Sequence, residues 1–144
     1  MFSKACEYGI RATIYIALQS MQDKRQSLKD IAKHIDSPVA FTAKILQQLV
    51  KNDIINSVKG AAGGFEIGKQ KIKEIKLKQI VTAIDGNSIY MGCGLGLSEC
   101  SEKNPCPVHY KFKAVRDKLR LMLEETSLYE LVEGLEDGLT FLRI

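Results

Sequence analysis

The 144-residue sequence lacks any long apolar run. In the N-terminal stretch "MFSKACEYGIRATIYIALQ", Lys4, Glu7 and Arg11 interrupt the apolar residues, so no segment approaches the roughly 20 apolar residues of a membrane-spanning helix. The same stretch lacks the basic region, continuous apolar region and small-residue cleavage site of a secretory signal. We therefore expect a cytoplasmic protein that has no membrane partner.

The sequence also lacks the usual signatures of an enzyme. It shows no nucleophile with an evident base, no phosphate-binding glycine loop and no pair of catalytic carboxylates. A chain of 144 residues is long enough for one core of ordinary size, or for one small domain with an appended dimerisation element. It is too short for a typical two-domain enzyme, and we expect no catalytic residues.

Positive charge is concentrated in one half of the chain. Residues 1–80 carry 14 Lys and Arg against 7 Asp and Glu, a net charge of +7, whereas residues 81–144 carry 7 against 10, a net charge of −3. The basic half is where a polyanion such as DNA would bind, although solvated surface lysines would give the same count.

The basic half contains the pattern of a helix-turn-helix. An amphipathic helix is expected over residues 3–20, and "SLKDIAKHID" predicts a second helix with Ser27 as its N-cap. The next segment, "SPVAFTAKILQQLVKNDII", predicts a third helix with Ser37 as N-cap, Pro38 at its first position and an end near Asn52. Because only two residues separate the second and third helices, they must turn sharply against one another.

A wing follows the helix-turn-helix. The short segments "IINSV" and "GFEI" flank the glycine-containing tip "KGAAG", which predicts two strands joined by a turn. Another amphipathic segment, "LKQIVTAID", follows and stops near Gly86. The expected fold is mainly helical with a small β-wing, in which residues 1–85 form a winged helix-turn-helix DNA-binding domain.

Two further segments complete the expected organisation, a cysteine-rich loop over residues 86–106 and a dimerisation segment over residues 107–144. A helix of about 19 residues is expected from Pro107, and "TSLYELVEGL" predicts a last short helix that opens with Ser127. The long helix carries an apolar stripe with spacings of 4, 3, 4 and 3, namely Val108, Phe112, Val115, Leu119 and Met122. A second copy of the chain is the simplest partner for this stripe, and packing on its own domain is the alternative.

DNA contacts are expected from the exposed face of the third helix, from the wing and from nearby lysines. Gln and Lys can meet base edges or phosphates, whereas Ala and Phe can contact a thymine methyl group. The candidates are Lys4, Lys29, Ser37, Ala40, Phe41, Lys44, Gln47, Gln48, Lys51, Lys59 and Gly60. This hypothesis predicts that affinity falls steeply with salt, and the alternative is a helix-turn-helix that contacts only protein.

The stretch "CGLGLSECSEKNPCPVH" holds three of the four cysteines and one of the two histidines. The gaps between Cys93, Cys100 and Cys106 are too long for a zinc knuckle and do not match ferredoxin spacing. In a reducing cytosol such thiols are reduced, metal-bound or redox-sensing, and a flexible loop could wrap a larger inorganic core. His109 is one candidate for an exchangeable fourth ligand, and Glu7 is its rival.

The other cysteine and histidine have ordinary structural explanations. Cys6 is isolated on the first helix, where we expect it to be a small packed residue and not a ligand. His34 lies at the end of the second helix, and we expect it to be exposed.

The passages "SKACEYGIRA", "LVKNDIINSVKGAAGGF", "LKQIVTAIDG" and "TSLYELVEG", together with the three cysteines ahead of a long helix, resemble the Rrf-type family of bacterial winged-helix regulators. The resemblance implies a homodimer, crossed through the long helix, that binds inverted-repeat operators and usually represses. It also implies a [2Fe-2S] or [4Fe-4S] cluster held by Cys93, Cys100 and Cys106. His109 falls where IscR-like members place a histidine, and Glu7 falls where NsrR-like members use an acidic ligand.

The expected function is therefore a dimeric transcriptional regulator, a repressor, whose DNA binding is modulated by an iron-sulfur cluster that senses redox state, nitric oxide or iron-sulfur status. Two alternatives stay open. One is a cluster-free, CymR-like repressor whose cysteines act as thiol switches. The other is a winged-helix adaptor that binds no DNA.

Overall fold

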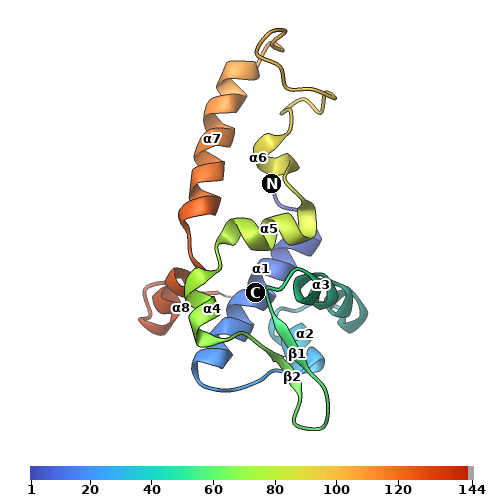
Figure 1. The fold of residues 1–144 in the computed structure, drawn as a ribbon, viewed down its shortest axis with the longest axis vertical. Coiled ribbons are helices and arrows are strands. Elements are labelled where there is room, and N and C mark those ends of the chain that lie inside the picture. Colours follow the sequence, from blue (N-terminus) through green and yellow to red (C-terminus); the bar gives the residue numbers. More distant parts are fainter. Residues whose placement is uncertain (143–144) are drawn as a thin grey trace.

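The computed structural model describes residues 1–142 and consists of helices with one small sheet (Figure 1). This arrangement confirms the expected mainly helical fold with a two-stranded wing. The short helices α4 and α6 were not expected from the sequence. The elements in chain order are α1 (Lys4–Met21), α2 (Leu28–His34), α3 (Val39–Lys51), β1 (Asn56–Val58), β2 (Gly64–Glu66), α4 (Lys69–Glu74), α5 (Leu77–Asp85), α6 (Ser88–Met91), α7 (His109–Glu125) and α8 (Leu128–Glu136).

Serine side chains cap three of the helices. Ser3 Oγ accepts a hydrogen bond from the backbone N–H of Cys6 at 3.0 Å, which begins α1. Ser27 and Ser127 cap α2 and α8 in the same way, at 3.2 and 3.1 Å, as the sequence predicts. Each such cap satisfies a backbone N–H that has no partner within its own helix and contributes about 1 kcal/mol.

The start of α3 differs from the prediction. Pro38 has an extended backbone (φ −56°, ψ 136°) and occupies the cap position, so α3 begins at Val39. The carbonyl of Pro38 accepts the first helical hydrogen bond, from the N–H of Thr42 at 2.9 Å. Ser37 is therefore one residue too early to cap the helix, and its hydroxyl is buried without a partner among residues 1–142. The predicted cap at Ser37 is wrong.

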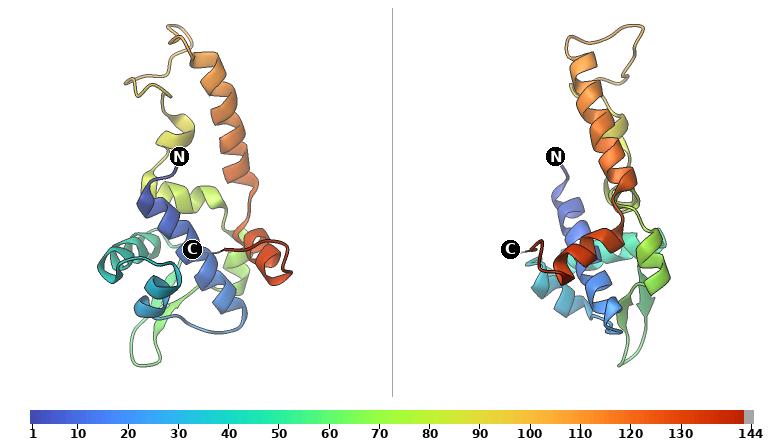
Figure 2. Two further views of the ribbon diagram at one scale, coloured as in Figure 1. Left: turned by 180° about the vertical axis from the view of Figure 1, so that it is seen from behind. Right: turned by 90° about the vertical axis from the view of Figure 1, so that its left-hand side faces the viewer.

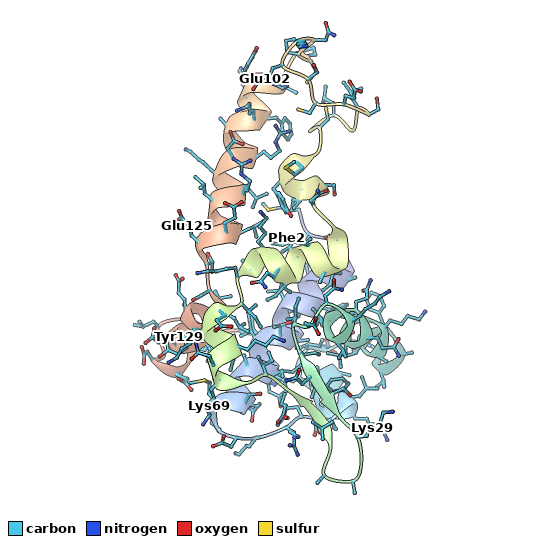
Figure 3. All side chains as sticks on the ribbon, in the orientation of Figure 1. Phe2, Lys29, Lys69, Glu102, Glu125 and Tyr129 are labelled. Carbon is cyan, nitrogen blue, oxygen red and sulfur yellow. The ribbon has the colours of Figure 1, made fainter. Side chains whose placement is uncertain are left out.

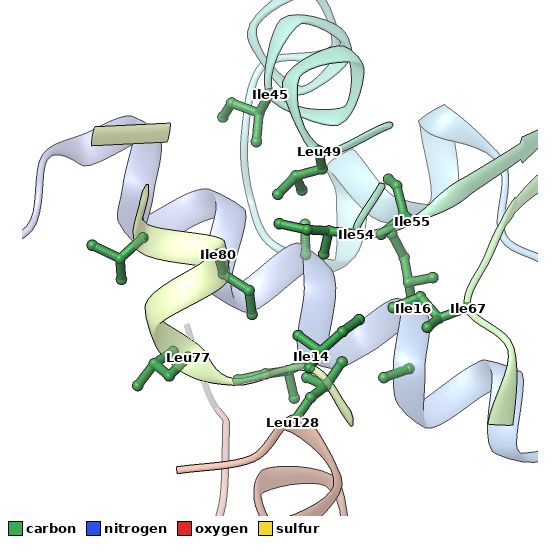
Figure 4. Packing of buried hydrophobic residues seen from close by; sticks show 14 of the residues in the cluster. Ile14, Ile16, Ile45, Leu49, Ile54, Ile55, Ile67, Leu77, Ile80 and Leu128 are labelled. Carbon is green, nitrogen blue, oxygen red and sulfur yellow. The ribbon is translucent and has the colours of Figure 1, made fainter. Parts of the chain in front are cut away.

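The core lies around α1, which packs against α3, α5 and α8. Figure 4 shows Ile16 of α1 close to the turn after α3, and Ile80 of α5 facing the same interior. The two side chains are fully buried, as are Leu46 and Leu49 of α3. Since each large aliphatic side chain contributes about 1.5 to 3 kcal/mol on burial, this cluster fixes α3 with its opposite face toward solvent.

The wing is tied to the segment between α1 and α2. β1 and β2 are antiparallel, with Ser57 opposite Phe65, and Phe65 exchanges two backbone hydrogen bonds with Gln26, at 2.8 and 3.1 Å. Gly64 has a φ of +139°, and a Cβ there would lie 2.7 Å from the carbonyl oxygen of Gln26, so only glycine fits. The wing therefore has a defined position relative to the helix-turn-helix.

Helix α7 and residues 92–108 extend away from the rest of the chain (Figure 2). Only His109 and Leu123 of α7 are buried. At its other end α7 is held by a short bridge, because Leu77 donates to the carbonyl of Thr126 at 2.9 Å and Leu128 donates to that of Ile75 at 2.8 Å. Over residues 1–142, no helix is both long and apolar enough to cross a membrane.

Candidate DNA-binding face and cysteine site

The solvent-facing side of α3 presents most of the predicted DNA-contact residues. Thr42, Ile45, Leu46 and Leu49 are buried and hold the opposite side of the helix on the core. Their burial at positions i, i+3, i+4 and i+7 leaves one continuous solvent-facing side. The predicted residues on that face are exposed, namely Ala40, Lys44, Gln47, Gln48 and Lys51.

Phe41 differs from the other residues predicted on this face. Its ring is half-buried and packs edge-on against the ring of Tyr8 of α1, with the ring centroids 5.7 Å apart. Position 41 lies one turn before the buried Ile45, at the edge of the apolar side of α3, which explains the contact. Phe41 therefore connects α3 to α1, and only the exposed part of its ring is available to a ligand.

The wing tip and two nearby lysines are also exposed. Lys59 and Gly60 form the turn between β1 and β2, where Gly60 has a φ of +106° and no neighbouring atom within 4 Å of an added Cβ. Lys29 is exposed on α2. Lys4 is partly neutralised, because its Nζ lies 3.2 Å from a carboxylate oxygen of Glu7 and 5.2 Å from the ring centre of Tyr8.

The cysteine loop lies at the opposite end of the molecule from the wing and Lys29 (Figure 3). Figure 3 labels Lys29 near the wing and Glu102 at the far tip of the loop. Any effect of the loop on DNA binding must therefore pass through the helices between the two sites.

Cys93 is surrounded by backbone N–H groups at the start of the loop. The N–H of Leu95 donates to its sulfur at 3.4 Å. This hydrogen bond, a second from Leu97 and smaller contributions from Gly96 and the Cys106 side chain lower the pKa of the Cys93 thiol. Such N–H groups stabilise a thiolate, which is the form that binds metals and reacts with oxidants.

Cys100 lies against the start and middle of α7. Its sulfur is 3.5 Å from Nδ1 of His109 and 3.1 Å from Nη1 of Arg116, which donates to it. His109 is only 4% exposed, and its Nε2 is buried without a hydrogen-bond partner among the described residues. A buried imidazole with a free nitrogen is uncommon in folded proteins and indicates a site that a further group completes.

Of the predicted ligands, Cys100 and His109 thus lie in contact, and the Cys106 side chain contributes to the lowered pKa of Cys93. Within residues 1–142, no three Cys, His, Asp or Glu side chains are close enough to hold a metal ion as a group. Glu7 is exposed and paired with Lys4.

The loop also packs on α7 through apolar and charged contacts. A Cβ added at Gly94 would come within 2.4 Å of the ring of Phe112, so the loop backbone lies directly on this ring. Nearby, Lys113 bridges Glu102 of the loop at 3.8 Å and Asp117 of α7 at 3.3 Å. Met1, Ile89 and Leu119 line a mainly apolar hollow beside these residues, between α6 and α7.

Cys6 and His34 lie outside the loop. Cys6 is fully buried, as predicted, and burial together with the nearby Asp85 carboxylate raises the pKa of its thiol to about 12. His34 is exposed, as predicted, and stacks on Tyr15 with the ring centroids 3.8 Å apart. Desolvation lowers the pKa of His34.

Comparison with known protein families decides the class of the protein. The model of the Rrf2 family, described as "Iron-dependent Transcriptional regulator", matches residues 2–134. The chain belongs to the Rrf2 family. It is therefore a transcriptional regulator and not an enzyme, as the sequence predicts, and membership of this family implies that it binds DNA.

Individual relatives of this Rrf2 protein agree with that assignment. A protein of Aquifex aeolicus, by name an HTH-type transcriptional regulator, is 31% identical over 134 residues, which cover 92% of this chain and 91% of that protein. The HTH-type transcriptional regulator IscR of Photorhabdus laumondii is 28% identical over 129 residues, covering 90% of this chain and 77% of the relative.

Solved structures of other regulators share the fold. CymR, titled the global cysteine regulator of B. subtilis, has a TM-score of 0.76 at 20% identity, with coverage of 92% of this chain and 96% of CymR. IscR of T. potens has a TM-score of 0.74 at 18% identity, with coverage of 99% and 93%.

Sequence reasoning missed two residues of this Rrf2 protein that connect its parts. Arg116 reaches the loop from α7, and its position two turns after His109 was the available signal. Asp85, at the end of α5, accepts hydrogen bonds from the backbone and hydroxyl of Ser3 and so holds the start of α1. No local pattern distinguishes Asp85 from an exposed helix-terminal carboxylate.

Proposed function

We propose that this Rrf2 protein is a homodimeric repressor that binds inverted-repeat operators and whose DNA affinity depends on an iron-sulfur cluster. DNA binding is assigned to residues 1–85, sensing to residues 86–106 and dimerisation to residues 107–144. The observation that carries the proposal is the buried His109, whose Nδ1 lies beside the Cys100 sulfur and whose Nε2 has no partner in the described chain.

The side chains present fit such a group. Cys93, Cys100 and Cys106 are free, partly exposed thiols on one glycine-containing loop. Backbone N–H groups around Cys93 favour its thiolate, the form in which cysteines bind iron-sulfur clusters, and the guanidinium of Arg116 donates a hydrogen bond to the Cys100 sulfur. A bound cluster would supply a redox-active and chemically labile centre, whose state depends on oxidants and on iron supply.

His109 is the better candidate for the fourth ligand. It is buried next to one of the three cysteines, whereas Glu7 is exposed and its carboxylate pairs with Lys4 in the same chain. A contribution from Glu7 would have to come from the first helix of a partner subunit. Replacement of His109 by Ala should therefore weaken cluster retention more than Glu7→Gln does.

The exposed side of α7 supports dimerisation. Phe112, Val115 and Met122 of the predicted stripe remain exposed in the single chain, and Leu119 is half-buried. A contiguous apolar face of this kind on a helix that extends from the domain is typical of an interface. Two copies crossed along α7 would bury it and would fix the distance between the two α3 helices.

A chain of contacts connects the loop to the DNA-binding face. The loop lies on α7, α7 and α6 pack together, and α5 leads into α6. Asp85 at the end of α5 holds Ser3 at the start of α1, and α1 in turn packs against α3. We infer a two-state coupling in which cluster assembly orders residues 93–106 against α7 and α1 and thereby sets the separation of the recognition helices.

Anaerobic purification tests the cluster. The expected result is a brown protein with visible absorption and bound iron and sulfide, and Cys100→Ser should lose most of both. Cys6→Ser is the matched control, because Cys6 is buried in the core and should leave the iron and sulfide content unchanged. A colourless wild-type protein with free thiols would contradict the proposal.

A cluster-free regulator with thiol-switch cysteines is the second candidate function. It is favoured by the lowered pKa of the Cys93 thiol, to which the side chain of Cys106 contributes. Oxidation of Cys93 by a peroxide would give a sulfenic acid that the Cys106 thiol could attack, which releases water and leaves a disulfide. Mass spectrometry after peroxide treatment of the colourless protein would detect this Cys93–Cys106 bond.

A charge-reversal experiment tests whether the protein is instead an adaptor that binds no DNA. The exposed Lys44 of α3 and Lys59 of the wing tip are replaced together by Glu. Loss of promoter occupancy is the expected result, because both positions would meet phosphates or base edges. Unchanged occupancy would favour the adaptor.

A further inference from the structure

Arg116 of α7 contacts the cysteine loop at two places, Gly92 and Cys100. Its Nη1 donates to the carbonyl oxygen of Gly92 at 2.6 Å and to the sulfur of Cys100 at 3.1 Å. Gly92 directly precedes Cys93 and terminates α6. A single guanidinium therefore joins two loop positions that are eight residues apart in sequence to the middle of a rigid helix.

The other charges around the loop do not replace this contact. Lys113 is shared between two carboxylates, those of Glu102 and Asp117. Arg120, one turn after Arg116, pairs with Asp117 at 3.6 Å. Within residues 1–142, Arg120 forms no ion pair or hydrogen bond with the loop. Among the described lysines and arginines, Arg116 is the one that donates a hydrogen bond to a cysteine of the loop.

Arg116 is also well suited to this position by its chemistry. A guanidinium stays charged at all relevant pH values and presents several N–H donors in a fixed plane, so it can hold a carbonyl and a thiolate at once. Hydrogen bonds to charged groups are the strong ones, and hydrogen bonds to the sulfur ligands are among the features that set the potential of iron-sulfur clusters.

We propose that Arg116 is the positioning residue of the cysteine site, which fastens residues 92–100 to α7 and presents positive charge to the Cys100 sulfur. The part of this inference that concerns the cluster rests on the proposed function. The fastening of the loop does not, because it depends only on the two contacts that Arg116 makes within the chain. Loss of Arg116 should loosen the loop. It should also make reduction of a bound cluster less favourable, because reduction adds a negative charge that the nearby guanidinium would otherwise stabilise.

The first experiment uses the metal-free full-length protein. Hydrogen exchange of peptides within residues 92–100 is compared between wild type and Arg116→Gln, a change that preserves helix propensity. Loss of the charge-assisted contact should speed exchange by roughly ten- to hundredfold in these peptides. Arg120→Gln removes the same charge one turn away and should match wild type, and Arg116→Lys should lie between the two because it keeps the charge without the fork.

The second experiment uses protein purified anaerobically, with the midpoint potential and the rate of loss of visible absorption as readouts. Arg116→Gln should lower the midpoint potential and should make the loss of visible absorption roughly tenfold faster. Arg120→Gln should change neither the potential nor this rate. Thermal unfolding of each variant shows whether the fold is intact, and Arg116→Lys provides the test if Arg116→Gln is unstable.

The outcomes separate the two proposals. If wild type carries iron and sulfide but Arg116→Gln equals it in loop exchange, potential and cluster loss, the role of Arg116 is overturned and the proposed function stands. If wild type carries no iron or sulfide under these conditions, the proposed function fails and the cluster role of Arg116 fails with it. Faster loop exchange in Arg116→Gln would in that case still support the fastening of the loop.

Discussion

Replacement of Val115 by Asn tests whether α7 forms the dimer interface. Val115 lies in the middle of the apolar stripe of α7 and is 65% exposed in the single chain. Val and Asn have similar helix propensities and similar sizes, so the change should leave the helix itself intact. What it removes is the apolar surface that a partner subunit would cover.

The expected loss follows from this exposure. Complete burial of a valine side chain contributes about 1.5 kcal/mol, so covering the 65% that remains exposed contributes about 1 kcal/mol per chain. In a dimer with twofold symmetry the substitution occurs twice, which gives about 2 kcal/mol and a Kd that is about 30-fold weaker. An unpaired amide buried at the interface would increase the effect further.

Sedimentation velocity over a dilution series measures this change, with far-UV circular dichroism as a check on folding. Leu121→Asn is the comparison, because Leu121 is 49% exposed but lies about 120° around the helix from Val115. We expect the smaller effect from Leu121→Asn. An unchanged dimerisation constant in Val115→Asn would refute the assignment of the interface to this stripe.

Three further outcomes are expected. Lys44→Gln and Lys59→Gln should each reduce the magnitude of the slope of log affinity against log salt concentration by about 1. A wild-type affinity that does not change with salt concentration would contradict phosphate contacts. Cys6 should resist iodoacetamide at pH 8 because its pKa is about 12, and labelling at the rate of the loop thiols in the metal-free protein would contradict its burial. Ser20→Ala should lower the free energy of unfolding in urea by about 1 to 3 kcal/mol, because the Ser20 hydroxyl accepts from a buried backbone N–H just after β2 at 3.0 Å. The exposed Ser98→Ala should change it little, and equal effects would argue against that buried bond.

Local signals predicted most of the fold. The caps at Ser27 and Ser127 depend on residues three positions away, and the structure contains both. The end of α5 at Gly86, with a φ of +74°, likewise follows from a single residue. α4 and α6 were missed because helices of six and four residues are too short to show a periodic pattern.

The departures within predicted elements have a different cause. The start of α3 moved to Val39 because Pro38 adopts an extended backbone in the turn after α2, where Asp36 has a φ of +51°. Phe41 is half-buried because its ring packs against that of Tyr8 on α1. Both outcomes depend on how two helices meet, which spacing along one helix does not specify.

The cysteine site was predictable as a set of residue types but not as an arrangement. The spacing from Cys93 to His109 predicts a loop at the start of a long helix, which the structure contains. It does not predict that Cys100 lies between His109 and Arg116. The roles of individual DNA-contact residues and of the fourth ligand remain predictions.

The sequence by itself determined the winged helix-turn-helix, its exposed basic face and the position of the cysteines ahead of α7, because these depend on periodicity, caps and turns between near neighbours. Only the tertiary structure decided that the loop and the wing lie at opposite ends of the molecule (Figure 3), that Arg116 reaches Cys100, and that Asp85 holds the start of α1. These contacts join residues that are 16 and 82 positions apart in sequence. They form because burial of the core around α1 brings the helices together, and no pattern within a single helix records that packing.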